Sequence, residues 1–129
     1  MNKYNKYLLL AIKILVSVAF LGAGLSKLAG VEMMVTTYEE IGFGQWFRYL
    51  TGVIEVGSVI LLWLGSKQVY GAFLLVCTML GAVLTHYFIL GPSAVPAIVL
   101  GLLSAYILYY YRGQLSFLNK KEPPLRLLF

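Results

Sequence analysis

Three of the ionisable side chains in the long apolar stretches of this sequence stand out: Lys27, Glu55 and His86. Together, an ammonium, a carboxyl group and an imidazole can exchange protons and can hydrogen-bond a polar ligand. In lipid, a charged side chain costs about 2.5–3.5 kcal/mol even on a lenient insertion scale, so each of these groups requires an explanation. We therefore treat these three residues as a candidate ligand-binding or proton-relay site.

Two hydroxyl residues, Ser26 and Thr85, are direct neighbours of this set and extend the candidate site. Lys27 has a long stem that can extend toward Glu55. One interpretation is a pocket for a small polar headgroup, for a quinone or for a proton relay. The other is a charge pair with a hydrogen-bonded histidine, which only fixes how the helices pack. The sequence leaves both open.

Several other chemistries are excluded by residue content. Cys77 is the only cysteine, so an intrachain disulfide or a CxxC redox pair is impossible. A single histidine provides no two-histidine haem site, and no cluster suits zinc. Phosphate-loop, HExxH and GxSxG motifs are also missing. We predict no metal and no catalytic residue, and we expect that the chain is not an enzyme on its own.

The composition indicates that lipid surrounds most of the chain. Of 129 residues, 60% are hydrophobic and only 12% are charged, whereas soluble domains carry about 25% charged residues. A chain this short has too little interior to bury so much apolar surface. The net charge of +5 comes from basic residues that cluster at the ends of apolar segments, as in membrane proteins, so we predict no nucleic-acid partner.

Four apolar stretches approach the length that a membrane-spanning helix needs, about 20 residues. They occupy residues 8–28, 47–64, 69–90 and 94–111. The short breaks between the later stretches favour antiparallel neighbours. The predicted fold is an all-α bundle of four transmembrane helices in one domain, residues 1–112, followed by a cytoplasmic tail, residues 113–129.

Charge asymmetry predicts the orientation of this bundle. The amino terminus, the second connection and the carboxyl terminus share one side, which carries Lys3, Lys6, Lys67, Arg112, Lys120, Lys121 and Arg126. The opposite side carries Lys27 and Arg48 together with Glu32, Glu39 and Glu40. The positive-inside rule places the first side, and both termini, in the cytoplasm.

The first connection is predicted to contain a short amphipathic helix on the outer membrane surface, because Val31, Met34, Val35 and Tyr38 share one helical face before Gly42. Small residues predict close helix packing on two faces. These faces are Cys77, Gly81 and Thr85 on the third span, and Ala97, Gly101 and Ala105 on the fourth.

Lys13 interrupts the first apolar stretch. A cleaved signal sequence would have a shorter, uninterrupted apolar region, so we expect the first helix to be retained. We also expect the Lys13 side chain to extend to the headgroups on the cytoplasmic side.

Three short motifs resemble those of the DoxX-like family of bacterial membrane proteins. FLGAGLSKL, from Phe20 to Leu28, resembles the family's signature at the end of its first helix. GVIE, ending at Glu55, resembles the second-helix motif, and Met79 with the Gly81 and Thr85–His86 region resembles the third. The positions that match the family's motifs include Lys27, Glu55 and His86.

The resemblance implies a four-helix protein of the bacterial cytoplasmic membrane with a link to redox systems. Related proteins are subunits of quinone-reducing complexes or partners of oxidative-stress enzymes. We therefore expect an accessory subunit that binds a quinone or a similar ligand in the outer half of the bundle, with a redox-enzyme partner or a second copy of itself. The alternatives are a non-enzymatic assembly factor or scaffold and, less favoured, a small-solute transporter.

Overall fold

The computed structural model describes residues 3–91 and 94–114, which are helical apart from short connections. The elements, in chain order, are α1 (Lys3–Ala29), α2 (Glu32–Ile41), α3 (Gln45–Leu62), α4 (Gln68–Thr85), the π-helical turn η1 (His86–Leu90), α5 (Val95–Tyr110) and the 3-10 turn η2 (Arg112–Gln114). No strand occurs in these residues, so the all-α prediction is confirmed.

Helices occupy the predicted stretches to within a few residues at most ends. The exception is the start of α1, which begins at Lys3. α2 is the helix predicted for the first connection. It ends at Gly42, which adopts φ +88° and donates its N–H to the carbonyl of Tyr38, as glycine does at helix ends. The predicted tail, 113–129, lies outside the described residues from 115 onward.

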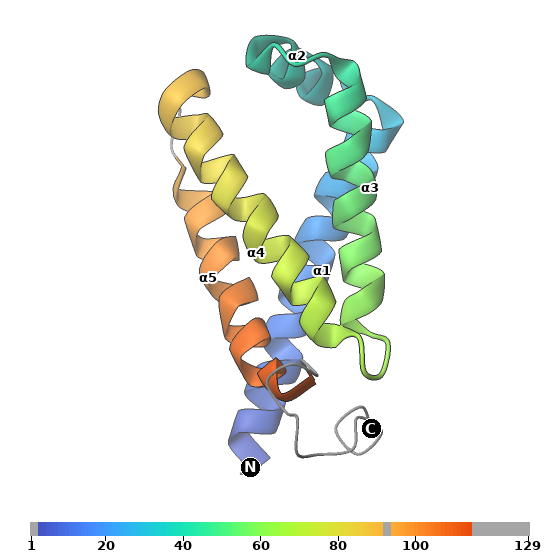
Figure 1. The fold of residues 1–129 in the computed structure, drawn as a ribbon, viewed down its shortest axis with the longest axis vertical. Coiled ribbons are helices and arrows are strands. Elements are labelled where there is room, and N and C mark those ends of the chain that lie inside the picture. Colours follow the sequence, from blue (N-terminus) through green and yellow to red (C-terminus); the bar gives the residue numbers. More distant parts are fainter. Residues whose placement is uncertain (1–2, 92–93, 115–129) are drawn as a thin grey trace.

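The four longer helices form two antiparallel pairs, α1 with α3 and α4 with α5, joined by packing of α3 against α4. Figure 1 shows α3 and α4 close together near their connection and separated at the other end, where α2 lies. There α2 packs on α3 and contacts η1. We call this the α2 end, and we call the end where α1 begins and α5 finishes the amino-terminal end.

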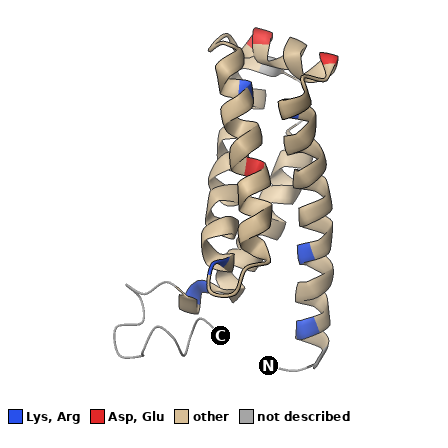
Figure 2. Ribbon diagram, turned by 90° about the vertical axis from the view of Figure 1, so that its right-hand side faces the viewer, with Lys and Arg blue, Asp and Glu red and all other residues tan. Residues whose placement is uncertain are grey.

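Basic residues lie at both ends of the bundle, whereas the described acidic residues lie away from the amino-terminal end, as Figure 2 shows. Among the described residues the acidic positions are Glu32, Glu39 and Glu40 on α2, and Glu55 within α3. The described part of the amino-terminal end contains basic residues and no acidic residue.

The exposed surface of the helices is largely apolar. Two helices are long and apolar enough to cross a membrane, Tyr4–Ala29 and Gln68–Ile89, and α5 is equally apolar but shorter. Only 33% and 17% of their most apolar windows are buried in the protein. A core helix of a soluble protein would be mostly buried, so these helices fit a lipid environment. Large side chains such as Val18, Leu80 and Leu102 are more than 60% exposed.

Two close helix contacts depend on glycine. A Cβ atom on Gly24 of α1 would lie 3.1 Å from the Gly52 carbonyl of α3, and a Cβ on Gly52 would lie equally close to the Gly24 carbonyl. Between α3 and α4, a Cβ on Gly71 would lie 2.5 Å from the Ser58 carbonyl oxygen. At these points the helix backbones approach each other directly, as small residues allow in membranes.

The packing face predicted for the third span is wrong. Cys77 and Gly81 are exposed, and a Cβ on Gly81 would meet no atom within 4 Å. The face that packs in α4 instead carries Gly71, Leu75 and Met79, because α3 contacts α4 through Gly71. On α5, the prediction is confirmed for Ala97, which is buried, and for Gly101, which lies against Met79.

We predict that Gly71→Ala destabilises the protein, whereas Gly81→Ala does not. The added methyl group at position 71 has no room beside the Ser58 carbonyl, and overpacking of this kind costs about 1–3 kcal/mol. Gly81 is the matched control on the same helix. Thermal unfolding in detergent, followed by circular dichroism, measures both. Equal melting temperatures for the two variants would contradict the close contact of α3 and α4.

Candidate functional site

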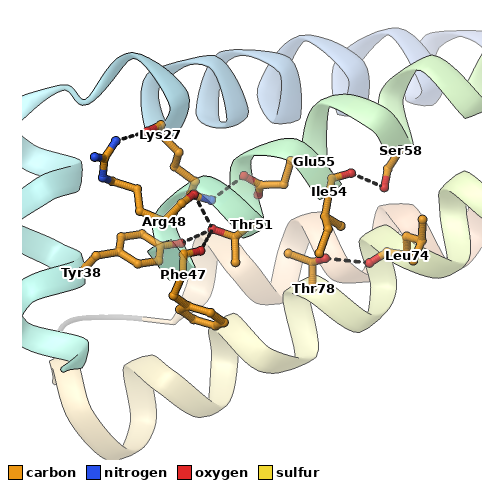
Figure 3. A network of polar contacts seen from close by, with 10 residues as sticks. All are labelled: Lys27, Tyr38, Phe47, Arg48, Thr51, Ile54, Glu55, Ser58, Leu74 and Thr78. Atoms are coloured by element: carbon orange, nitrogen blue, oxygen red, sulfur yellow. Dashed lines mark hydrogen bonds and ion pairs between the residues drawn. The ribbon is translucent and has the colours of Figure 1, made fainter. Parts of the chain in front are cut away.

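The candidate site is built around an ion pair between α1 and α3. Lys27 Nζ lies 2.5 Å from Glu55 Oε1, and the two side chains are 12% and 1% exposed. Side chains on a helix point back toward its amino terminus, so Lys27 extends back along α1 to the level of Gly24. There a Cβ on Gly24 would lie 3.2 Å from the Cβ of Glu55. The glycine contact therefore brings the carboxyl group within reach of the ammonium group (Figure 3).

Arg48 adds a second buried cation beside this pair. Its side chain is 5% exposed, and its guanidinium group donates hydrogen bonds to the Lys27 carbonyl and, at 2.7 Å, to Gln45 Oε1. The last carbonyl groups of a helix have no partner within the helix and carry its partial negative charge. Arg48 thus closes the carboxyl-terminal end of α1 (Figure 3).

The sequence pattern predicts Arg48 only as a charge on the side opposite the cytoplasm. One signal could have found it: Arg48, Gly52 and Glu55 are spaced by four and three residues, so they share one face of α3.

A hydroxyl pair attaches α2 to this site. The Tyr38 hydroxyl lies 2.7 Å from Thr51 Oγ1, which also contacts the carbonyls of Phe47 and Arg48. Tyr38 is the buried residue of α2, and its ring contacts that of Phe47. The apolar face predicted for this helix therefore packs on α3 at least at Tyr38, whose partner Thr51 lies one helical turn before Glu55.

The other predicted site residues do not join the ion pair. The Thr85 hydroxyl donates to the Gly81 carbonyl of its own helix. The Ser26 carbonyl accepts a hydrogen bond from the Val31 N–H, which closes the end of α1. His86 begins the π-helical turn η1, and its buried Nδ1 has no hydrogen-bond partner in the described part of the chain. Of the five predicted residues, the structure brings two together.

The charges of this site do not cancel. Lys27 and Arg48 are formally positive and Glu55 is negative, which leaves one positive charge in a largely buried cluster. Such a cluster can hydrogen-bond the oxygen atoms of a ligand, and the carboxylate can accept a proton. No group of three or more potential metal-ligating side chains occurs among the described residues.

A second polar cluster lies at the amino-terminal end, and it corrects the prediction for Lys13. The Lys13 side chain does not extend outward; it is 7% exposed and donates a hydrogen bond of 3.1 Å to the Tyr111 hydroxyl. Its ammonium group lies 4.3 Å from the centre of the Trp63 ring, and Trp63 Nε1 donates to Ser17 Oγ. Aromatic rings brought by α3 and α5 attract the cation inward, which sequence spacing alone could not reveal.

We predict that the ion pair contributes to stability through mutual compensation. Lys27→Met leaves Glu55 buried without its partner and should lower the free energy of unfolding by about 3–5 kcal/mol. Adding Glu55→Gln removes the unpaired charge and should restore much of this loss. SDS-induced unfolding in mixed micelles provides the measurement, with Glu39→Gln on the exposed face of α2 as the control. If the free energy of unfolding of the double variant falls by the sum of the losses in the two single variants, Lys27 and Glu55 are not coupled.

The chain was also compared with known proteins. Residues 11–107 match the DoxX-like family, which covers all of α3 and α4 and most of α1 and α5. No curated protein and no solved structure matches the chain. The family match covers well over half of the sequence and agrees with the apolar, lipid-compatible surface of the helices. The chain therefore belongs to the DoxX-like family and is a membrane protein.

Proposed function

We propose that the protein crosses the bacterial cytoplasmic membrane four times, with both termini in the cytoplasm. α1 and α4 have the length and hydropathy of membrane spans, and α5 is shorter but apolar. α3 has 18 residues, or about 27 Å at 1.5 Å per residue, close to the thickness of the hydrocarbon core. It is less apolar because it carries Arg48 and Glu55, whose charges are buried against α1. The basic amino-terminal end would face the cytoplasm.

Within this topology, the protein would bind the polar head of a quinone or a similar ligand at the ion pair, as an accessory subunit of a redox system. The observation that carries the proposal is the buried Lys27–Glu55 pair. Buried ionisable groups in membrane helices are costly, and a ligand or proton pathway is the default hypothesis for them. A quinone can enter from the lipid phase, and its carbonyl oxygens accept hydrogen bonds from cations.

Each residue would have a distinct role. Glu55 would accept or relay a proton, and Lys27 would hold the carboxyl group in its ionised form until a ligand competes for the ammonium group. Arg48 keeps the site net positive, which favours reduced, anionic forms of a ligand. His86 has a buried nitrogen that no described residue hydrogen-bonds, and this nitrogen could hydrogen-bond a ligand that reaches η1. π-helical turns of this kind are frequent at functional sites.

A second candidate function is an assembly factor or scaffold without a ligand. It is favoured by aromatic side chains near the α2 end that are more than 60% exposed, Phe43, Trp46, Tyr87 and Phe88. Such residues either anchor the protein at the membrane interface or dock a partner protein. Under this alternative, the ion pair would only fix the packing of α1 on α3.

Binding of decylubiquinone to the protein in nanodiscs, measured by calorimetry, tests the proposal. We expect Glu55→Gln and His86→Ala each to raise the Kd about tenfold, the value of one lost hydrogen bond to a charged or buried polar group. Glu39→Gln, which makes the same chemical change on the exposed surface of α2, should leave the Kd unchanged.

Two outcomes would refute ligand binding at this site. The first is that the wild-type protein shows no binding of decylubiquinone. The second is that both variants bind decylubiquinone with the wild-type Kd. Unfolding measurements on the same samples distinguish the scaffold. If the protein is a scaffold, Glu55→Gln lowers its stability and the recovery of co-purified proteins. In that case neither the wild type nor the variant binds decylubiquinone.

A further inference from the structure

The Lys13 ammonium group is buried without an acidic partner in the described chain. Lys27, by comparison, has Glu55, and Arg48 has two oxygen acceptors at the end of α1. The described contacts of Lys13 are one phenol hydroxyl, on Tyr111, and the faces of two aromatic rings. An ammonium group has three N–H donors, and the described chain offers it one oxygen acceptor and two aromatic faces but no negative charge.

The surroundings of Lys13 reinforce this imbalance. The described basic residues at the amino-terminal end are Lys3, Lys6, Lys13, Lys67 and Arg112, and no described acidic residue lies there to offset them. Lys67 and Arg112 each lie near an aromatic ring, and residues 3–91 and 94–114 offer neither of them a carboxylate partner. A buried cation inside a basic surface attracts an anion from outside the protein.

The two aromatic residues that border Lys13 are partly exposed. Trp63 is the last-turn cap of α3 and is 46% exposed, and Tyr111 caps α5 and is partly exposed. Trp63 is held by its hydrogen bond to Ser17. The Tyr111 hydroxyl has no described hydrogen-bond partner other than Lys13, so an anionic oxygen that replaces it at the ammonium group breaks no other described hydrogen bond.

We infer that Lys13, bordered by Trp63 and Tyr111, forms a binding site for a phosphate group. The features that carry this inference are the aromatic face at 4.3 Å from the ammonium nitrogen and the single oxygen acceptor, a neutral hydroxyl, described for this buried cation. A phosphate group supplies several strong acceptors and the missing negative charge. This chemistry is present in the headgroups of anionic phospholipids, which lie where helix ends meet the membrane surface, and also in free inorganic phosphate. The site is separate from the Lys27–Glu55 pair and does not depend on the function proposed there.

Native mass spectrometry tests the lipid source, using protein released from nanodiscs that contain equal amounts of phosphatidylglycerol and phosphatidylcholine. We expect the wild type to retain phosphatidylglycerol about tenfold over phosphatidylcholine, as expected for one charge-assisted contact. Lys13→Met should abolish this preference and Lys13→Arg should preserve it. Lys6→Met removes the same charge from an exposed position of α1 and should have no effect.

Inorganic phosphate, added to protein in nanodiscs of phosphatidylcholine alone, tests the other source. A rise in melting temperature that Lys13→Met removes and Lys6→Met retains would assign the site to free phosphate. The inference is overturned if the wild type shows no lipid preference and no phosphate-dependent shift, a result that requires no variant to fold. It is also overturned if Lys6→Met and Lys13→Met reduce the preference equally, because the effect would then come from overall charge.

Discussion

The close approach of α1 and α3 at Gly24 and Gly52 is the constraint on which the α2 end depends. A Cβ atom at either position would lie 3.1 Å from the facing carbonyl oxygen, so a larger residue would require the two helices to move apart. At this distance Lys27 reaches Glu55, and the carboxyl group can be buried to 1% exposure in apolar surroundings. Without a partner at that depth, its charge would carry the full cost of leaving water.

The remaining contacts at the α2 end build on the same packing. Arg48 lies on the glycine-bearing face of α3, and it can reach the carbonyl of Lys27 only because α1 ends beside it. Tyr38 then binds Thr51 and holds α2 over the helix pair. One continuous arrangement therefore contains the glycine contact, the ion pair, the cap of α1 and the docked helix α2. A ligand site at this place would be held by all of these contacts.

The two ends of the bundle compensate buried cations by different means. At the α2 end a carboxylate and carbonyl oxygens receive them. At the amino-terminal end Lys13 is surrounded by a phenol and aromatic rings, which attract a cation more weakly than a full negative charge does. The cations at the α2 end therefore have a carboxylate or carbonyl partner within the protein, whereas Lys13 is the one for which we infer an external anion. Both can exist in a membrane protein because the intervening helix surface is apolar and faces lipid.

Composition and apolar periodicity were sufficient to predict the helical elements and the helix that Gly42 caps, because these depend on local propensity and on transfer to lipid. The short motifs were sufficient to predict the family. The pairing of Lys27 with Glu55 also followed from their spacing and reach. The sequence could not show which face of α4 packs, that Lys13 turns inward, or that Arg48 caps α1 while His86 stays apart. Those outcomes depend on how neighbouring helices are rotated and offset, and this is decided by contacts between residues far apart in the chain.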